Sequence, residues 1–506
     1  MFSHIILAGL LILIIFAPIA VGSVYIVTYS AMELLIYSLL ALHLWTADFA
    51  HLNAQLSGSS SVNSTPNTQH STRSSYLRRT LLLMSPIFLF HIFCLFQMLP
   101  LPFYFLEKLS PQTAALYMRL GLPLGFTPLA QSSLPLTLSL SVTNAAMLKW
   151  LAYTAVFFLA ATFVPPNADE GWIDWLFMAV FVIGFAEAVY GLYLYLNQSE
   201  YLLWFKRMYQ RGGVAGTYIN YNHFVGLMNM CIPASVALFA SRIGFRSKTR
   251  YFQRATVDRV TIAASPNALF LYFLLLGLTV MVLAVIFSLS RMGQFSLIAA
   301  ITLFAVPYLL STARRPPRAL VLPVVLLAVL SLGLLWGAWK GLDPVEDRWQ
   351  TLKVSYEDRF LIWSSTSRLI RNFPLTGTGL GTYELAYAPY KPQRYGALIV
   401  DHAHNDYLEL ISEVGVAGFA PWLAFYLSFF LFTMHAWFKR RNHFSRFLGA
   451  GGLVAATAML VHSLADFNLQ IPANAMLLFL IMGLTWRVVN CPAQEREAMR
   501  RDVICK

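Results

Sequence analysis

The chain has 506 residues, of which 58% are hydrophobic and only 12% are charged, and its mean hydropathy is +0.61. These values exclude an ordinary soluble globular domain. The formal net charge is +13, and a strongly positive charge is typical of nucleic-acid-binding proteins. The basic residues here, however, cluster at the ends of apolar runs. Membrane topology and anionic lipids account for such clusters, so no nucleic-acid partner is expected.

The apolar residues gather in runs long enough to cross a membrane, because a helix needs about 20 such residues to span the hydrocarbon core. The sequence therefore predicts an all-α polytopic membrane protein with about twelve transmembrane helices. The runs lie near 4–22, 25–46, 81–104, 144–164, 173–195, 219–241, 268–290, 293–312, 319–340, 414–437, 447–465 and 472–489.

The positions of Lys and Arg predict the orientation of these helices. When both termini are placed in the cytoplasm, the basic residues are denser in the inward-facing segments than in the outward-facing ones. The cysteines fall inside predicted spans or in the cytoplasmic tail, so no disulfide is expected.

Three regions follow along the chain. Residues 1–340 carry the first nine predicted helices, and the Ser-, Thr-, Asn- and Gln-rich segment 52–75 predicts a disordered cytoplasmic loop. Residues 341–413 form one long outside loop with short helices, of which 357–372 alternates apolar and charged positions at helical spacing. Residues 414–506 carry the last three spans and a cytoplasmic tail.

Two arginines are predicted to lie at the outer membrane face. Arg211 precedes the motif GTYINYNHF, and Arg291 lies in a short turn between two apolar runs. An arginine in such a turn is costly unless it meets an anion or water. Guanidinium groups match phosphate oxygens in bidentate fashion, so the two arginines are candidates to hold a diphosphate. The alternative is interfacial anchoring or a salt bridge to a loop carboxylate.

The sequence HNDYLELISEVG predicts a new helix that starts near His404. At about 100° per residue, His404 shares one face with apolar residues. The carboxylates fall on the opposite side, at Asp406, Glu409 and Glu413. A histidine that is uncharged and partly desolvated at the mouth of a span can act as a general base near neutral pH. The alternative is a histidine that caps the helix start or meets water.

His402 lies two residues earlier and is expected to make local hydrogen bonds. A metal site built from His402, His404 and Asp406 is disfavoured because the segment offers no matching ligand cluster, so no metal is expected. His462 and Asp466 are four residues apart, a spacing that permits an imidazole–carboxylate contact.

Three further features are less specific. Glu33 and Glu187 lie within apolar spans, where a carboxylate is a functional candidate by default and a protonated structural acid is the alternative. A nucleotide-binding fingerprint requires a strand before the glycine-rich segment and a helix directly after it. The glycine-rich segment 376–381 has neither. It predicts a flexible turn that allows close backbone approach.

Together these motifs resemble the O-antigen ligase and O-antigen polymerase superfamily of bacterial envelope glycan transferases. The resemblance covers roughly residues 205 to 475. The matching pieces are GTYINYNHFVG from Gly216, SRMG from Ser290, DRFLIWSSTSRLIRNFPLTGTGLGTY from Asp358, DHAHNDYLELISEVGVAG from Asp401 and HSLADFNLQIPANA from His462.

The resemblance implies a multi-pass enzyme of the bacterial inner membrane that takes a glycan from undecaprenyl diphosphate and joins it to an acceptor hydroxyl at the periplasmic face. By likeness, His404 is the general base, Arg211 and Arg291 bind the diphosphate, and Arg359 is a further phosphate contact. The neighbouring His402 leaves open which imidazole is the base. The positions that would support this site are His402, Asn405, Asn222, His462 and Asp466.

The chemistry implied needs no metal and no cofactor. A polyprenyl diphosphate is a good leaving group once its charge is neutralised, so one base and fixed cations suffice, and direct attack inverts the anomeric centre. The acceptor can be the lipid A core, a growing O-antigen or exopolysaccharide chain, or a protein hydroxyl. A flippase or transporter of lipid-linked glycans is the alternative from a different class, disfavoured by the long outside loop and the few ionisable residues in mid-membrane.

Overall fold

The structure is a computed structural model that describes residues 2–56, 66–121, 133–164, 171–206, 212–246, 266–312 and 352–490. Most of these residues are helical, and ten of the described helices are long and apolar enough to cross a membrane. The predicted class of all-α polytopic membrane protein is therefore confirmed. The ten helices are α1 (Phe2–Ile19), α2 (Ile26–Leu56), α3 (Pro66–Met98), α6 (Leu140–Thr162), α7 (Gly171–Leu196), α8 (Tyr221–Arg246), α10 (Pro266–Phe287), α16 (Asp406–Lys439), α17 (His443–His462) and α18 (Pro472–Asn490).

Ten of the predicted apolar runs correspond to these helices. The run near 293–312 lies in α11 (Arg291–Thr312), whose apolar part is shorter than the other spans. The run near 319–340 lies outside the described residues. Helices also extend into both ends of the polar segment 52–75, because α2 continues to Leu56 and α3 begins at Pro66.

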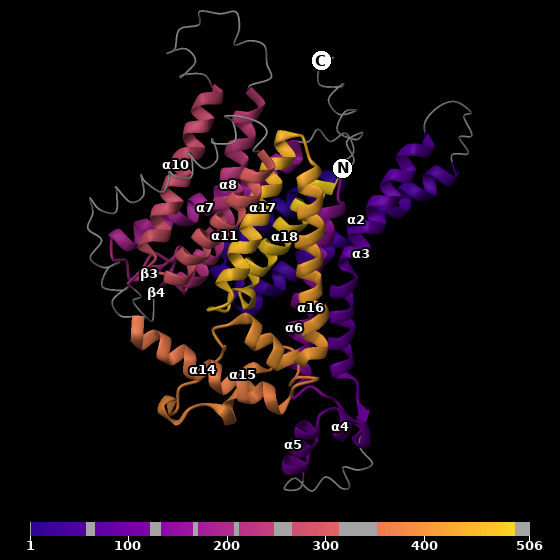
Figure 1. The fold of residues 1–506 in the computed structure, drawn as a ribbon, viewed down its shortest axis with the longest axis vertical. Helices are drawn as coiled ribbons and strands as arrows, with labels where there is room; N and C mark the ends of the chain where they lie inside the picture. The colour runs from indigo at the N-terminus through magenta and orange to yellow at the C-terminus, as the bar shows by residue number, and fades with distance from the viewer. Residues whose placement is uncertain are drawn as a thin grey trace, which may run out of the picture.

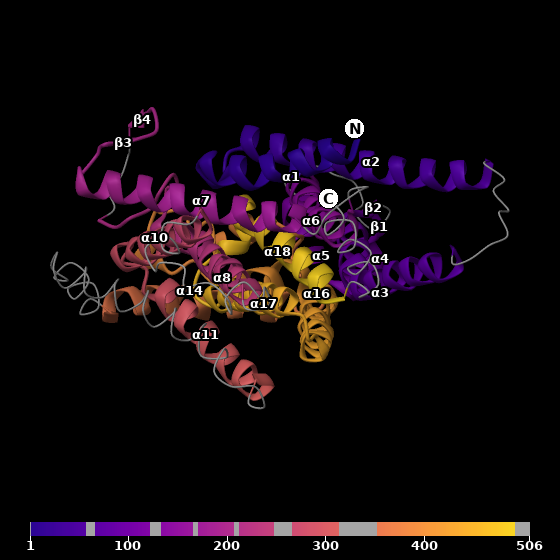
Figure 2. The same ribbon diagram turned by 90° about the horizontal axis from the view of Figure 1, so that it is seen from above.

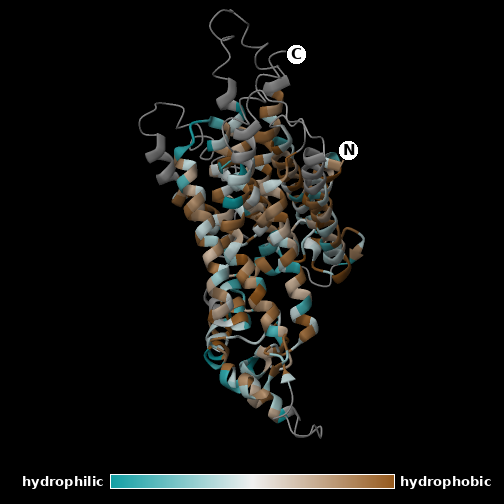
Figure 3. Cartoon of the chain, turned by 90° about the vertical axis from the view of Figure 1, so that its right-hand side faces the viewer, coloured by the Kyte–Doolittle hydropathy of each residue, from teal (hydrophilic) through white to brown (hydrophobic). Residues whose placement is uncertain are grey.

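Helices α8 and α18 form the centre of the bundle, and the apolar stretches of both are completely buried by the rest of the chain. Seen from above, α18 lies between α1 and α2 on one side and α16 and α17 on the other (Figure 2). The small residues of α17 permit its close packing, since Gly451 faces Ala237 of α8 and Gly452 faces Thr485 of α18. Apolar residues cover most of the length of the bundle (Figure 3).

The shorter elements gather at one end of the bundle, which we call the loop end (Figure 1). It carries α4 (Phe103–Leu109), α5 (Pro111–Gly121), α14 (Leu352–Asn372), α15 (Tyr383–Tyr387) and the 3-10 turns η6 (Ala388–Tyr390) and η7 (Gln393–Tyr395). Two small antiparallel sheets pair β1 (Leu101–Pro102) with β2 (Ser133–Leu134) and β3 (Tyr201–Leu202) with β4 (Phe205–Lys206).

Helix α14 contains the helical segment expected at 357–372 and is longer than the short helices predicted for this loop. It packs against α16. The indole Nε1 of Trp363 donates a hydrogen bond of 3.0 Å to the carbonyl of Ala403, so α14 is attached directly to the histidine segment that precedes α16.

Candidate active site

A single buried carboxylate, that of Asp466, lies at the centre of the candidate site. Its side chain is completely buried in the connection between α17 and α18. Three charged or ionisable groups from other segments surround it: His223 of α8 with Nε2 at 3.7 Å from Oδ1, His404 with Nδ1 at 3.8 Å from Oδ1, and Arg359 of α14 with Nη2 at 3.8 Å from Oδ2.

The charge of Asp466 follows from these neighbours. Burial alone raises the pKa of the carboxyl, but the contacts with His223 and His404 and the charge of Arg359 hold its pKa well below the usual range. Its Oδ1 also accepts a hydrogen bond of 2.9 Å from the backbone N–H of Phe467. Asp466 is therefore an anion at physiological pH and stabilises positive charge on the groups around it.

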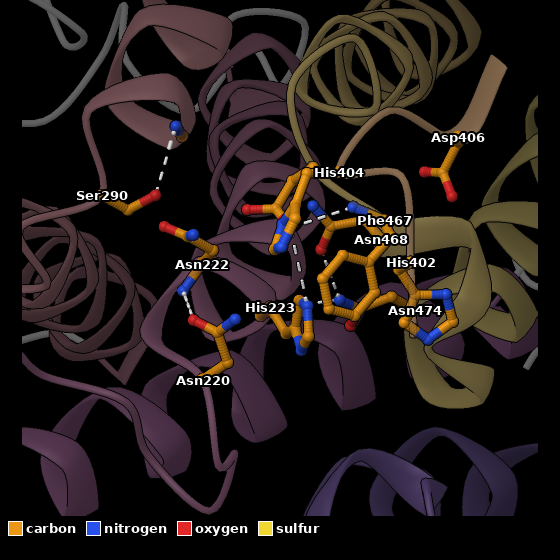
Figure 4. A network of polar contacts seen from close by, with 12 residues as sticks. Asn220, Asn222, His223, Ser290, His402, His404, Asp406, Phe467, Asn468 and Asn474 are labelled. Carbon is orange, nitrogen blue, oxygen red and sulfur yellow. Dashed lines mark hydrogen bonds and ion pairs between the residues drawn. The ribbon is translucent and has the colours of Figure 1, made fainter. Parts of the chain in front are cut away.

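The ring of Phe467 packs against three imidazoles. The centroid distances are 4.2 Å to His402, 4.5 Å to His223 and 5.0 Å to His404. Figure 4 shows the three histidines grouped around this ring. Phe467 thus stacks on His402 and meets His223 and His404 edge to face.

The start of α16 holds His404 in place. Asn405 is the N-cap residue, and its side-chain oxygen accepts from the backbone N–H groups of Tyr407 and Leu408, both at 3.0 Å. The amide nitrogen of the same side chain donates to the carbonyl of Leu464 at 2.8 Å. Asn405 therefore ties the first turn of α16 to the connection that carries Asp466.

The helical face predicted for His404 is wrong. Helix α16 begins only at Asp406, and His404 adopts φ 50°, in the left-handed region that non-glycine residues seldom occupy. Angular spacing along a helix does not apply to a residue before the N-cap. His404 is consequently not separated from carboxylates, because its Nδ1 faces Asp466.

His402 forms a tight ion pair instead. Its Nδ1 lies 2.8 Å from Oε1 of Glu409, whose other oxygen accepts from the backbone N–H of Ala403 at 2.7 Å. Burial lowers the pKa of His402, but the charge of Glu409 and the hydrogen bond to it outweigh this effect and raise the pKa to about 9. This contact agrees with the local hydrogen bonding expected for His402, and it leaves the imidazole protonated at neutral pH.

The two arginines in the middle of α14 have different partners. Arg359 faces Asp466, whereas Arg368 on the same helix donates to the side chain of Ser365 and the carbonyl of Tyr390. Arg291 begins α11 directly after the short connection from α10.

Arg211 lies outside the described residues. The segment that follows it docks on the end of α10, because the backbone N–H of Val214 donates to the carbonyl of Phe287 at 3.0 Å. This contact brings the start of the GTYINYNHF segment beside the turn that precedes Arg291.

His462 and Asp466, whose spacing permits a contact, form neither a hydrogen bond nor an ion pair with each other in the structure. Helix α17 ends at His462, so the spacing of four residues no longer places the two side chains on one helical face. The Nδ1 of His462 lies 3.5 Å from the side-chain nitrogen of Asn229. Asn222 lies at the start of α8, where its backbone N–H donates to the side chain of Asn220 at 3.0 Å (Figure 4).

His223 is the site residue to which the sequence interpretation gave no role. It follows Asn222 in the motif GTYINYNHF, and its position at the start of a predicted span was the available signal. The side-chain nitrogen of Asn474 donates to its carbonyl at 2.8 Å, so α18 fixes this part of α8.

Two features predicted from the sequence hold segments of the site in place. The turn at 376–381 approaches α16 closely, as expected: the N–H of Gly379 donates to the carbonyl of Glu413 at 2.8 Å. Glu187 accepts two hydrogen bonds of 2.8 Å from the backbone N–H and the hydroxyl of Thr217, which anchors the GTYINYNHF segment to α7. The Oε1 atom of Glu33 has no hydrogen-bond partner within the described part of the chain.

Among the described residues, no group of three or more His, Cys, Asp or Glu side chains is arranged to hold a metal ion. The cluster around Asp466 is thus a carboxylate surrounded by two imidazoles and a guanidinium. Such a cluster can orient an imidazole, accept a proton and bind an anionic group.

A family model described as O-antigen ligase matches residues 276–423. The matched segment runs from α10 into α16 and includes Arg291, Arg359, His402 and His404. The resemblance to the O-antigen ligase superfamily is thereby confirmed, and it supports a glycosyltransferase of the ligase or polymerase type. None of the curated proteins compared with the chain matches it.

Proposed function

We propose that this membrane protein is a glycosyltransferase that moves a glycan from undecaprenyl diphosphate to an acceptor hydroxyl. The observation that carries the proposal is the buried anion of Asp466 between the imidazole of His404 and the guanidinium of Arg359. This arrangement occurs in a chain whose residues 276–423 match O-antigen ligase.

His404 is the general base in this proposal. Its Nδ1 faces Asp466, and its side chain is 32% exposed, so Nε2 is left for the acceptor hydroxyl. Asp466 favours the tautomer that carries its proton on Nδ1 and stabilises the imidazolium that forms when Nε2 takes up a second proton. His402 is less suited to this step, because its ion pair with Glu409 keeps it protonated at neutral pH.

The transfer is a direct displacement at the anomeric carbon. The acceptor oxygen forms the new glycosidic bond while its proton passes to Nε2 of His404. The bond from the anomeric carbon to the diphosphate oxygen breaks, and its electron pair leaves with the undecaprenyl diphosphate. One displacement inverts the anomeric configuration.

The arginines neutralise the leaving group. A guanidinium has five N–H donors, and the contact of Arg359 with Asp466 is a single one at 3.8 Å, so donors remain for phosphate oxygens. Arg291 at the start of α11 and Arg211 supply further positive charge. A leaving group neutralised by fixed cations departs without a metal ion.

The proposed location is the bacterial inner membrane, with both termini in the cytoplasm and the loop end facing the periplasm. The acceptor is the lipid A core for a ligase. Extension of an O-antigen or exopolysaccharide chain, or transfer to a protein hydroxyl, would use the same site.

The test uses the purified full chain in lipid nanodiscs with undecaprenyl-diphosphate-linked glycan and an acceptor glycan. We expect release of undecaprenyl diphosphate together with a new glycosidic bond. His404→Ala should lower kcat by about 10²–10⁴-fold, the usual contribution of a general base. His435→Ala is the matched control, because His435 is an exposed histidine in the C-terminal part of α16.

Undiminished turnover of the His404→Ala variant would remove His404 from the base role. Movement of the intact lipid-linked glycan across the membrane without a new bond would instead indicate a flippase.

A further inference from the structure

A cavity of ≈ 290 Å³ adjoins His402 on the side of α6. Its walls come from α2, α6, α15 and α16 and from the connections that contain Gly381, Asp401 and Gln470. No described residue of α8, α11 or α14 lines it, although these helices carry His223, Arg291 and Arg359. The cavity therefore lies beside the Asp466 cluster and is built from different helices.

Four polar side chains at the cavity wall form no hydrogen bond or ion pair with the described part of the chain. Within the described ranges, the side chains of Lys149, Glu384, Asp401 and Gln470 make no hydrogen bond and no ion pair, although all four line the cavity. The ammonium of Lys149 lies 5.1 Å from the centre of the Tyr29 ring. Glu33, Glu413 and Glu409 act electrostatically on Lys149, but none of the described carboxylates forms an ion pair with it. A lysine within a transmembrane bundle without such a pair is a candidate for ligand binding.

Two further carboxylates that line the cavity, Glu409 and Glu413, already accept hydrogen bonds from the protein. Glu409 is engaged by His402 and by the backbone N–H of Ala403, and Glu413 accepts from the backbone N–H of Tyr383 at 3.1 Å. These two carboxylates therefore have a structural role in shaping the cavity. The side chains of Lys149, Glu384, Asp401 and Gln470 keep hydrogen-bonding capacity for a ligand.

The chemistry of the wall fits a sugar ring. Carboxylates accept hydrogen bonds, an ammonium donates them and an amide does both, so together they match hydroxyl groups, each of which donates and accepts. Tyr29, Trp150 and Tyr153 add aromatic surface for the apolar face of a ring. A phosphate would meet the negative charges of Glu384 and Asp401, and a simple cation would meet Lys149.

The size of the cavity agrees with one sugar ring. Small-molecule sites usually have volumes of roughly 300–1,000 Å³. A cavity of ≈ 290 Å³ lies just below that range, so it accommodates a single ring better than an extended chain.

We infer that this cavity binds the terminal sugar ring of a glycan acceptor, an inference that rests on the transferase function proposed above. In a direct displacement, the nucleophile and the leaving group occupy opposite sides of the anomeric carbon. The cations for the leaving group come from α11 and α14, whereas the cavity is formed by α2, α6, α15 and α16. Lys149 donates to a ring hydroxyl, and Asp401 and Glu384 accept from others.

The first arm of the test measures binding without turnover. The purified full chain in nanodiscs is titrated with methyl glycosides of glucose, galactose and N-acetylglucosamine, and saturation-transfer NMR reports contact. We expect at least one glycoside to bind the wild type, and Lys149→Gln and Asp401→Asn each to weaken that binding by about tenfold, the loss expected for one charge-assisted hydrogen bond.

Lys108→Gln is the matched control, because Lys108 also lies over a tyrosine ring, 4.2 Å from the centre of Tyr104, but does not line the cavity. Asp401 is an exposed loop residue, so Asp401→Asn keeps the test valid if Lys149→Gln fails to fold. Absence of glycoside binding by the wild type, or equal binding by wild type and folded variants, overturns the inference.

The second arm separates this inference from the proposed function. In the transfer assay, Lys149→Gln should raise the acceptor KM about tenfold and leave the donor KM unchanged. Glycoside binding that depends on Lys149, without glycan transfer by the wild type, would contradict the transferase but support a sugar site. Transfer by the wild type with an unchanged acceptor KM in Lys149→Gln would support the transferase and overturn the assignment of this cavity.

Discussion

The Nδ1 atom of His404 lies 3.8 Å from Oδ1 of Asp466, although one residue precedes α16 and the other follows α17. Backbone contacts hold the two segments together: the N–H of Asp406 lies 3.0 Å from the carbonyl of Ser463 and 3.2 Å from that of Asp466. The oxygen Oδ2 of Asp406 also accepts from the N–H of Leu469 at 3.0 Å. These contacts therefore fix the position of the imidazole relative to the carboxylate.

Replacement of Asp466 by Asn should reduce transfer without preventing folding, because the amide keeps the size of the side chain and removes its charge. The neutral side chain no longer stabilises the imidazolium of His404, so we expect kcat to fall by about 10²-fold. Asp358→Asn is the control, since Asp358 forms an exposed pair with Arg394. Equal kcat values for wild type and Asp466→Asn in the transfer assay would show that His404 acts without this carboxylate.

Arg359 and Arg368 provide a matched pair on α14. Only Arg359 faces Asp466, whereas Arg368 is bound by Ser365 and Tyr390. Loss of a charged hydrogen bond to phosphate costs about 1.5–3 kcal/mol, so Arg359→Ala should lower kcat/KM for the lipid-linked donor about 10–100-fold. Arg368→Ala should change it little. Similar losses in both variants would indicate that α14 contributes general positive charge.

The sequence predicted most of the fold because apolar runs of about 20 residues are sufficient evidence for membrane helices. It also predicted the turn at 376–381, since repeated glycines indicate close backbone approach. The prediction from helical spacing was wrong at His404 because the N-cap lies one residue later, at Asn405, and His404 itself has a left-handed φ.

The convergence of His223, Arg359 and Asp466 could not be predicted, because it depends on how α8, α14 and the end of α17 pack. Hydrophobic periodicity identifies a buried face but does not identify the helix that covers it. The motif around His223 was visible in the sequence, and only the packing of α8 against α17 gives that histidine a partner.

The ion pair of His402 and Glu409 should make stability depend on pH. The pKa of His402 is raised from 6.5 to about 9, so the pair contributes fully below pH 6.5 and its contribution is lost as the pH rises through about 9. We expect the difference in melting temperature between wild type and His402→Gln to be largest near pH 6 and to shrink towards pH 9.5. A difference that stays constant over this range would contradict a charged His402.

The kink of α16 at Gly415 should not tolerate a side chain. Gly415 has φ 58° and ψ −173°, a combination found almost only in glycine, and an added Cβ would collide with the backbone of Leu375 and Thr376. We expect Gly415→Ala to destabilise the protein by about 1–3 kcal/mol from strain alone, and by more from the collision.

Gly396 separates these two effects, since it also has a positive φ, of 48°, but nothing within 4 Å of an added Cβ. Gly396→Ala should therefore show the cost of strain alone. Thermal unfolding of both variants in nanodiscs measures the difference. Because Gly415 follows directly after the helical turn that carries Glu409 and Glu413, its variant should also lose transfer activity, whereas Gly396→Ala should retain it. Equal destabilisation by the two substitutions would mean that the backbone at Leu375 and Thr376 moves away from α16 at little cost.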